Sequence, residues 1–227
     1  MCGRFALKTP KDEIKEYLGI DVCTTDLIEN YNIAPTNNVS AIINHKEIKK
    51  LGNLQWGLIP RWAKDSNYQS KMINARSETL EEKPSFKEAF QNRRCLIIAD
   101  GYYEWEQYSN EKKPHYIFHK TNKVFTFAGL WDIWLNPNNE KVKTCTIITT
   151  KANKTYAKIH ERMPVVIERE NQQQWLNTEE TPESLKSLLL TPSEDTFQNY
   201  IVSQFVNSVK NNSPECIKLS ENVSLFE

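Results

Sequence analysis

The sequence is poor in glycine and proline, which account for six and ten of its 227 residues. Disordered and fibrous chains are usually richer in both, so the composition favours a folded globular protein. An excess of either charge is also missing, because 29 lysines and arginines balance 29 aspartates and glutamates. This balance excludes a histone-like polycation, but it leaves room for a basic patch on one face.

Cysteines are few and are not arranged in pairs. The five of them, at positions 2, 23, 95, 145 and 216, form no CxxC motif and have no metal-like spacing relative to the four histidines. An odd number at low density is typical of a reducing compartment and argues against a disulfide framework. We therefore expect no metal and no other cofactor.

Long hydrophobic runs are missing as well. No segment approaches the roughly 18 apolar residues of a membrane-spanning helix. Charged residues such as Arg4 interrupt the stretch that would have to be the apolar core of a signal peptide. The sequence thus predicts a soluble, cytoplasmic protein without membrane association.

Helix and strand signals alternate along the chain. Thr9-Pro10 predicts a helix with Thr9 as N-cap that ends at Gly19, residues 85–88 form a capping box for a helix through residue 90, and Thr181-Pro182 and Thr191-Pro192 predict two more helix starts. β-rich runs predict strands at 39–43, 54–59, 95–99, 116–119, 124–130, 143–150, 165–167 and 202–209, with breaks at 44–45 and 52–53. No linker or repeat divides the chain. We expect one α+β domain over residues 1–227, with a mostly antiparallel, barrel-like sheet surrounded by helices.

Cys2 is the most informative residue for chemistry. If Met1 is removed, Cys2 carries a free α-amine beside its thiol, with ordinary pKa values of about 7.7–8.0 and about 8.5. An unprotonated amine attacks an aldehyde to give an imine, as catalytic lysines do. The thiolate can then close on the imine carbon to form a five-membered thiazolidine ring, which no internal cysteine can do. The alternative is a cysteine that follows the initiator methionine by chance.

Two further residues are candidates for proton transfer. Glu104 lies among the aromatic residues of segment 101–105, at or just beyond the end of the predicted strand 95–99. Such surroundings raise the pKa of a carboxyl group through desolvation. His160 lies just before the predicted strand 165–167, and its ordinary pKa of about 6.5 suits a proton shuttle. A surface position for Glu104 and a structural role for His160 are the alternatives.

Arginine and aromatic residues are interleaved. Arg4, Arg76 and Arg162 lie within short motifs, and guanidinium groups match phosphate oxygens. Flat faces for stacking on bases are offered by Trp56, Trp62, Tyr102, Tyr103 and Trp105. This combination is typical of single-stranded nucleic acid binding, although some of these aromatic side chains also suit a buried core.

Several separate segments, in the same order, resemble one protein family. They are residues 1–5, 31–36, 56–64, 73–79, 94–105, 128–131 and 160–164, with weaker similarity at 202–203 and 207. The segments are similar to those of the SOS response-associated peptidase (SRAP) family, whose members cross-link themselves to abasic sites in single-stranded DNA. The sequence departs from the family pattern at Ile98, where proline is usual, and at Glu106, where a basic residue is common.

The resemblance implies a β-barrel-like core with helices around it, a positively charged groove for single-stranded DNA, and removal of Met1 by the protein itself. It implies that Cys2 forms a thiazolidine with the ring-opened aldehyde of the abasic sugar. It also implies that Asn74, Glu104 and His160 are the polar residues around the aldehyde carbon. The resemblance further implies phosphate contacts from Arg4, Arg76 and Arg162. Packing against bases or sugars is implied for Pro35, Trp62 and Trp105.

Two other functions stay open at this point. One is a thiol peptidase for other proteins, with Cys2 as nucleophile, His160 as base and Glu104 or Asn74 as orienting partner. The other is a non-catalytic module that binds single-stranded DNA. As partners we expect single-stranded DNA with abasic sites and proteins of the replication fork. We expect a monomer that is cytoplasmic and associates with the nucleoid when bound to DNA.

Overall fold

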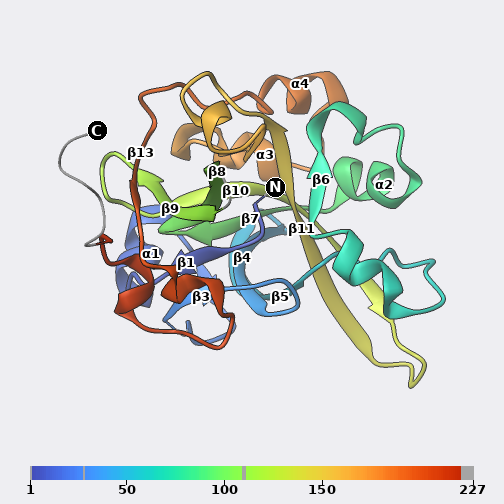
Figure 1. Cartoon of the computed structure of the whole chain (residues 1–227). Coiled ribbons are helices and arrows are strands. Elements are labelled where there is room, and N and C mark those ends of the chain that lie inside the picture. Colours follow the sequence, from blue (N-terminus) through green and yellow to red (C-terminus); the bar gives the residue numbers. More distant parts are fainter. Residues whose placement is uncertain (1, 28, 109–110, 221–227) are drawn as a thin grey trace.

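A closed ring of strands forms the centre of the molecule (Figure 1). In the computed structural model, the described residues are 2–27, 29–108 and 111–220. The ring consists of β4 (Asn38–His45), β5 (Ile48–Trp56), β7 (Arg94–Ala99), β10 (Phe125–Leu135) and β11 (Lys141–Lys151). Neighbours in it run antiparallel, except that β11 pairs with β5 in parallel. This last pairing closes the five strands into a barrel.

A second sheet continues from the barrel. Its strand order is β13 (Phe197–Ile201), β9 (Glu111–His119), β8 (Gly101–Tyr108), β1 (Phe5–Leu7) and β3 (Asn30–Ile33), all antiparallel. β7 leads into β8 through a single residue, Asp100, so the barrel and the sheet share one continuous run of chain. The pairing of β1 with β8 holds the beginning of the chain against the middle of the molecule.

Short strands and helices complete the structure. β6 (Asn74–Arg76) lies parallel to β11, β12 (Arg162–Pro164) lies antiparallel to β11, and β2 (Val22–Cys23) lies parallel to β5. The helices are α1 (Lys11–Leu18), α2 (Pro84–Asn92), α3 (Gln172–Leu176) and α4 (Pro182–Ser187), and 3₁₀ turns cover Ser66–Lys71, Ser77–Thr79, Tyr156–Lys158, Arg169–Asn171, Gln204–Asn207 and Pro214–Ile217. The expected α+β fold with a mostly antiparallel, barrel-like core is thus confirmed. Within the described part of the chain, no helix is long and apolar enough to cross a bilayer.

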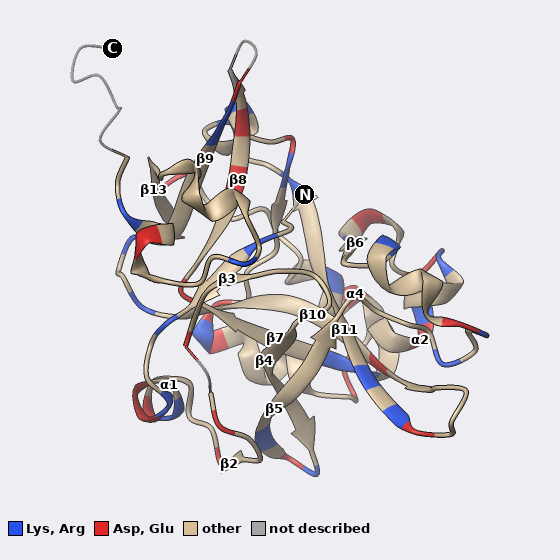
Figure 2. Ribbon diagram, turned by 60° about the horizontal axis from the view of Figure 1, so that its bottom comes forward, with Lys and Arg blue, Asp and Glu red and all other residues tan. Residues whose placement is uncertain are grey.

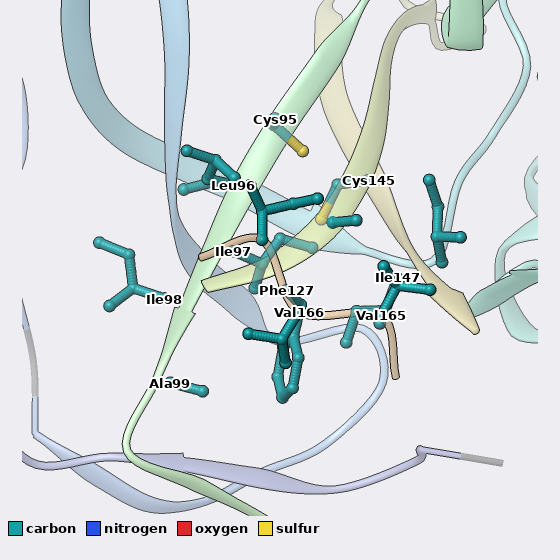
Figure 3. Close-up of a cluster of buried hydrophobic side chains, with 14 of the residues drawn as sticks. Cys95, Leu96, Ile97, Ile98, Ala99, Phe127, Cys145, Ile147, Val165 and Val166 are labelled. Carbon is teal, nitrogen blue, oxygen red and sulfur yellow. The ribbon is translucent and has the colours of Figure 1, made fainter. Parts of the chain in front are cut away.

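The largest cluster of buried side chains comes from the barrel strands and from the faces of α1, α2 and α3 that pack against them. Every residue of β7 is buried, and Figure 3 shows its side chains packed with those of β10, β11 and the segment that carries Val165 and Val166. Such a continuous apolar strand is typical of a strand covered on both faces. Gly101 opens β8 because a Cβ there would lie 2.5 Å from the ring of Tyr116. The junction between barrel and second sheet therefore depends on a residue without a side chain.

Two predicted helix caps are wrong. The N-cap position of α1 is Pro10, and the Thr9 hydroxyl instead donates to the buried carboxylate of Asp100. α2 begins after Lys83, and no side chain caps it, so the capping box at 85–88 does not form. Two other signals are confirmed: Gly19 ends α1 in a left-handed conformation, with φ of 61°, and the Thr181 side chain caps α4 by accepting from the Ser184 N–H.

Several predicted boundaries are also wrong. β5 ends at Trp56 and continues through the expected break at 52–53. The strand expected at 165–167 lies earlier, as β12, while Val166 forms only an isolated bridge to Phe127. No helix follows Thr191-Pro192, and the strand expected at 202–209 contains a 3₁₀ turn over Gln204–Asn207. β13, with the polar sequence FQNYI, was not predicted because it lacks the apolar alternation of a strand signal.

Candidate active site

Cys2 lies directly before β1 and is fully buried. Burial raises the pKa of its thiol well above the ordinary value, and the negative charge of Glu104 adds to the effect. A hydrogen bond from the Arg4 backbone N–H acts in the opposite direction. In the chain with Met1 still attached, the Cys2 thiol therefore keeps its proton near neutral pH.

Glu104 lies within β8, not at the end of a strand as the sequence suggested. Only 5% of the residue is exposed, so the alternative of a surface position is excluded. Alternate residues of a strand face the same side, which places Glu104 on the side of β8 that Tyr102 also faces. Burial raises the pKa of the Glu104 carboxyl, and the positive charge of His160 partly offsets this effect. A carboxyl with a raised pKa is a candidate for general acid or base catalysis.

His160 and Asn74 come from segments on either side of β11. The Arg162 backbone N–H donates to His160 Nδ1 at 3.0 Å, and the same ring nitrogen lies 3.2 Å from the Arg162 carbonyl. Asn74 is the first residue of β6 and its Nδ2 donates to the Ile73 carbonyl at 3.0 Å. Asn74 Oδ1 is buried and accepts no hydrogen bond from the described residues. It is thus ready to accept one from a bound group.

Three of the four predicted catalytic residues lie close enough for their charges to influence one another. Glu104 interacts with Cys2 on one side and with His160 on the other. Asn74 lies on β6, and both Figure 1 and Figure 2 draw the first described residues close to this strand. Segments that are far apart in sequence therefore meet at the beginning of the chain.

Arg4 and Trp105 are held together on the face of β8 opposite Glu104, because neighbouring residues of a strand point to opposite faces. The Arg4 guanidinium donates to Asn32 Oδ1 at 2.7 Å and to the Val206 carbonyl at 3.0 Å, and it lies 5.8 Å from the centre of the Trp105 ring. The indole N–H of Trp105 donates to Asn207 Oδ1 at 2.8 Å. Both side chains are partly exposed. A cation and a flat ring in fixed positions suit contact with a phosphate and a base.

The other predicted DNA contacts differ in accessibility. Arg76 is exposed at the end of β6, and Pro35 is partly exposed after β3. Trp62 is 52% exposed, with its ring edge-on to Tyr68 at 5.4 Å between centres. By contrast, Trp56, Tyr102 and Tyr103 have no more than 1% of their surface exposed. The expectation that these three offer stacking faces is wrong, because they belong to the core.

Arg162 is engaged within the protein. Its two terminal nitrogens donate to the two carboxylate oxygens of Glu78 at 2.7 and 2.9 Å, and one of them also donates to the Thr149 carbonyl at 2.6 Å. Arg162 is 9% exposed, whereas the Glu78 side chain is 44% exposed. The fork fastens β12 to β11 and to the turn that follows β6. The phosphate contact implied by the resemblance stays a prediction.

We expect Arg162→Ala to lower the free energy of unfolding by about 1–3 kcal/mol, because the buried Thr149 carbonyl loses its charged donor. Glu78→Gln should cost less than about 1 kcal/mol, since an ion pair with a solvent-accessible carboxylate contributes little. Chemical denaturation of both variants measures this difference. A larger loss for Glu78→Gln than for Arg162→Ala would contradict the structural role of Arg162.

The raised pKa of Glu104 has a consequence for stability. A carboxyl whose pKa is higher in the folded than in the unfolded protein stabilises the fold fully below the unfolded pKa, about 4.3, and loses this contribution as pH rises through the folded pKa. Glu104→Gln removes the buried charge. We expect its free energy of unfolding to match the wild type near pH 4 and to exceed it increasingly toward pH 8. A variant less stable than wild type at pH 8 would contradict this.

Sequence analysis missed the residues that support the site. Asn32, 2% exposed, accepts from Arg4, and its amide group donates to the carbonyls of Val206, Ser208 and Asn211. These bonds fix the carboxyl-terminal segment, including Asn207, next to Trp105. The only feature of the sequence that could have indicated this role is the position of Asn32 as a polar residue between Tyr31 and Ile33. Among the described residues, no group of three or more His, Cys, Asp or Glu could hold a metal ion.

Comparison with known proteins gives consistent matches. The family model described as SOS response associated peptidase (SRAP) matches residues 1–209. The abasic site processing protein YoqW of Bacillus subtilis (strain 168) is 47% identical over 222 residues, which cover 96% of this chain and 99% of that protein. The abasic site processing protein HMCES of Xenopus tropicalis is 33% identical over 266 residues, which cover 96% of this chain and 78% of that protein.

Solved structures show the same fold. A protein from Bacteroides thetaiotaomicron matches with a TM-score of 0.88 at 26% identity, covering 96% of this chain and all of that chain. A protein from Bordetella bronchiseptica matches with a TM-score of 0.72 at 27% identity, covering 89% of this chain and 95% of that chain. The arrangement of barrel and second sheet is therefore shared by proteins of low sequence identity.

Proposed function

The chain belongs to the SRAP family, and we propose that it processes abasic sites in DNA by capturing them covalently at Cys2. Its curated relatives from Bacillus and Xenopus are named abasic site processing proteins. One observation carries the proposal for this chain: a buried carboxyl, Glu104, interacts with both Cys2 and His160. The amino-terminal residue and two groups able to move protons thus share one site.

Removal of Met1 precedes the reaction. The peptide bond to Met1 occupies the Cys2 nitrogen, so only the mature chain has an α-amine that can attack a carbonyl carbon. We propose that the protein removes Met1 itself, with the Cys2 thiol as nucleophile and Glu104 and His160 transferring the protons. A general peptidase for other proteins is disfavoured, because an ordinary thiol peptidase has no use for a free α-amine on its nucleophilic residue.

Capture then proceeds in three steps. Glu104 and His160 move protons during opening of the sugar hemiacetal, which frees the aldehyde. The Cys2 amine adds to the aldehyde carbon, and water leaves as the imine forms, assisted by an acid. The Cys2 thiol closes on the imine carbon to give the thiazolidine. Holding amine, thiol and aldehyde together lowers the barrier through proximity.

Asn74 and the arginine and aromatic side chains bind the DNA strand. Asn74 Oδ1, which has no hydrogen-bond donor among the described residues, accepts from the Cys2 amine or a sugar hydroxyl. Arg4, Arg76 and Arg162 contact phosphates, while Trp62, Trp105 and Pro35 pack against bases or sugars. Arg76 and Trp62 are exposed and meet this requirement without rearrangement.

The proposed cross-link protects the lesion and is not released in rapid catalytic turnover. A thiazolidine is stable, so each molecule protects one lesion, and protonation of the ring by Glu104 reopens the imine. Such a protein acts on single-stranded DNA. We therefore expect it to associate with the nucleoid when bound and to contact proteins of the replication fork.

The test uses two single-stranded oligonucleotides of the same sequence, one with an abasic site and one in which the abasic sugar has been reduced to an alcohol. We expect an adduct that survives denaturing gel electrophoresis only with the aldehyde-bearing strand. An adduct with both strands, or with neither, would refute covalent capture through the aldehyde.

A further inference from the structure

Two neighbouring tyrosines of β8 differ in how their hydroxyl groups are satisfied. The Tyr103 hydroxyl donates to the Tyr31 carbonyl at 2.6 Å. Tyr102 is 1% exposed, and its hydroxyl is buried with no hydrogen-bond partner among the described residues. Only one of these two polar groups therefore serves the fold.

The surroundings of the Tyr102 ring are aromatic. It packs edge-on against Phe127, with 6.1 Å between ring centres, and against Phe197, with 5.9 Å. A phenylalanine would keep both contacts and avoid the cost of burying an unpaired hydroxyl. The fold thus gains nothing from this oxygen. A buried hydroxyl without a partner in the folded protein suggests that its hydrogen bond forms during the reaction.

The position of Tyr102 indicates which partner. Tyr102 pairs in register with Phe5 of β1, three residues after Cys2, and its side chain belongs to the same buried cluster as Cys2. It interacts electrostatically with the Cys2 thiol and with Glu104. Burial raises the pKa of the Tyr102 phenol well above its ordinary value, so the group stays neutral and keeps a proton that it can donate to a hydrogen bond. Two anions occur nearby during the proposed capture, the Glu104 carboxylate and the Cys2 thiolate, and only the thiolate attacks the imine carbon during ring closure.

We propose that the Tyr102 hydroxyl donates a hydrogen bond to the Cys2 sulfur in the mature protein and stabilises it during ring closure. The inference rests on the proposed function. In this step the thiol proton passes to the Glu104 carboxylate, the sulfur electron pair forms the bond to the carbon of the protonated imine, and the C=N electron pair moves to nitrogen. Tyr102 keeps its proton throughout and lowers the energy of the sulfur anion.

The test compares Tyr102→Phe with Tyr103→Phe, which removes the neighbouring hydroxyl from a purely structural bond. Alkylation of Cys2 in the mature protein is followed against pH by mass spectrometry of its peptide. We expect the midpoint to rise by about one pH unit in Tyr102→Phe, since loss of a donor to the charged form raises a pKa. With abasic DNA at saturation we expect the stable cross-link to form about tenfold more slowly, with more imine trapped by borohydride.

The control variant should show the opposite pattern. Tyr103→Phe is expected to unfold at a lower temperature but to keep the wild-type alkylation midpoint and imine fraction. Tyr102→Phe is expected to unfold at the wild-type temperature or above it. An unchanged alkylation midpoint in Tyr102→Phe would overturn the inference even if cross-linking were slower. If the wild type forms no cross-link, the proposed function fails, while the alkylation midpoint still tests the hydrogen bond.

Discussion

Cys2→Ala is expected to abolish covalent capture of abasic single-stranded DNA, because the reactive pair of amine and thiol is incomplete and any imine is hydrolysed. Salt-sensitive, non-covalent binding should persist, since the arginines proposed to contact phosphates are unchanged. Replacing a fully buried thiol by a methyl group costs stability on the order of 1 kcal/mol, so the variant stays folded. Denaturing gels measure the adduct, and fluorescence anisotropy measures the binding.

Cys2→Ser separates the two covalent steps. When the variant is prepared without Met1, it retains the α-amine, so the imine forms, but the hydroxyl is a poorer nucleophile than the thiol and the ring does not close. We expect an adduct that borohydride traps and that heat releases. A heat-stable adduct with either variant would show that the thiazolidine is not the product.

Glu104→Gln is expected to slow cross-link formation about 100-fold, since a positioned acid or base contributes 10²–10⁴ to a rate. Glutamine has nearly the same shape but cannot exchange a proton. Release of the cross-link should slow as well, because reopening of the ring needs the same acid. Single-turnover gel assays at saturating abasic oligonucleotide measure both rates.

Binding of undamaged single-stranded DNA is the control for Glu104→Gln. The residue is buried, so its substitution should leave affinity for undamaged DNA nearly unchanged. Equal losses of affinity and of cross-linking rate would indicate a structural role for Glu104. Together with the expected gain in stability at pH 8, a slow but well-folded variant would identify the buried carboxyl as the source of proton transfer.

Local signals predicted much of the fold. The apolar stripe that Gly19 ends gave α1, and the apolar run at 95–99 gave β7. The closure of the barrel was not predictable in this way, because β5 and β11 pair across about 90 residues of intervening chain and in parallel. β13 was not predictable from its own sequence either, because its polar residues form a strand through pairing with β9.

Site chemistry was partly predictable for a different reason. The proposed chemistry of Cys2 follows from its position after Met1, and Glu104 and His160 were candidates for proton transfer from their sequence surroundings, whereas the role of Asn74 came only from the resemblance to a family. Long-range partners could not be inferred from either source. Glu78, which pairs with Arg162 across 84 positions, and Asn32, which ties Arg4 to the carboxyl-terminal segment, become visible only in the structure.

Intact mass spectrometry of the purified protein, before and after incubation with an abasic oligonucleotide, tests the central claim most directly. We predict that the protein alone lacks the mass of one methionine and that incubation adds the mass of the oligonucleotide minus one water. A protein that retains Met1, or one that has lost it and gains no mass, would contradict capture by an amino-terminal cysteine.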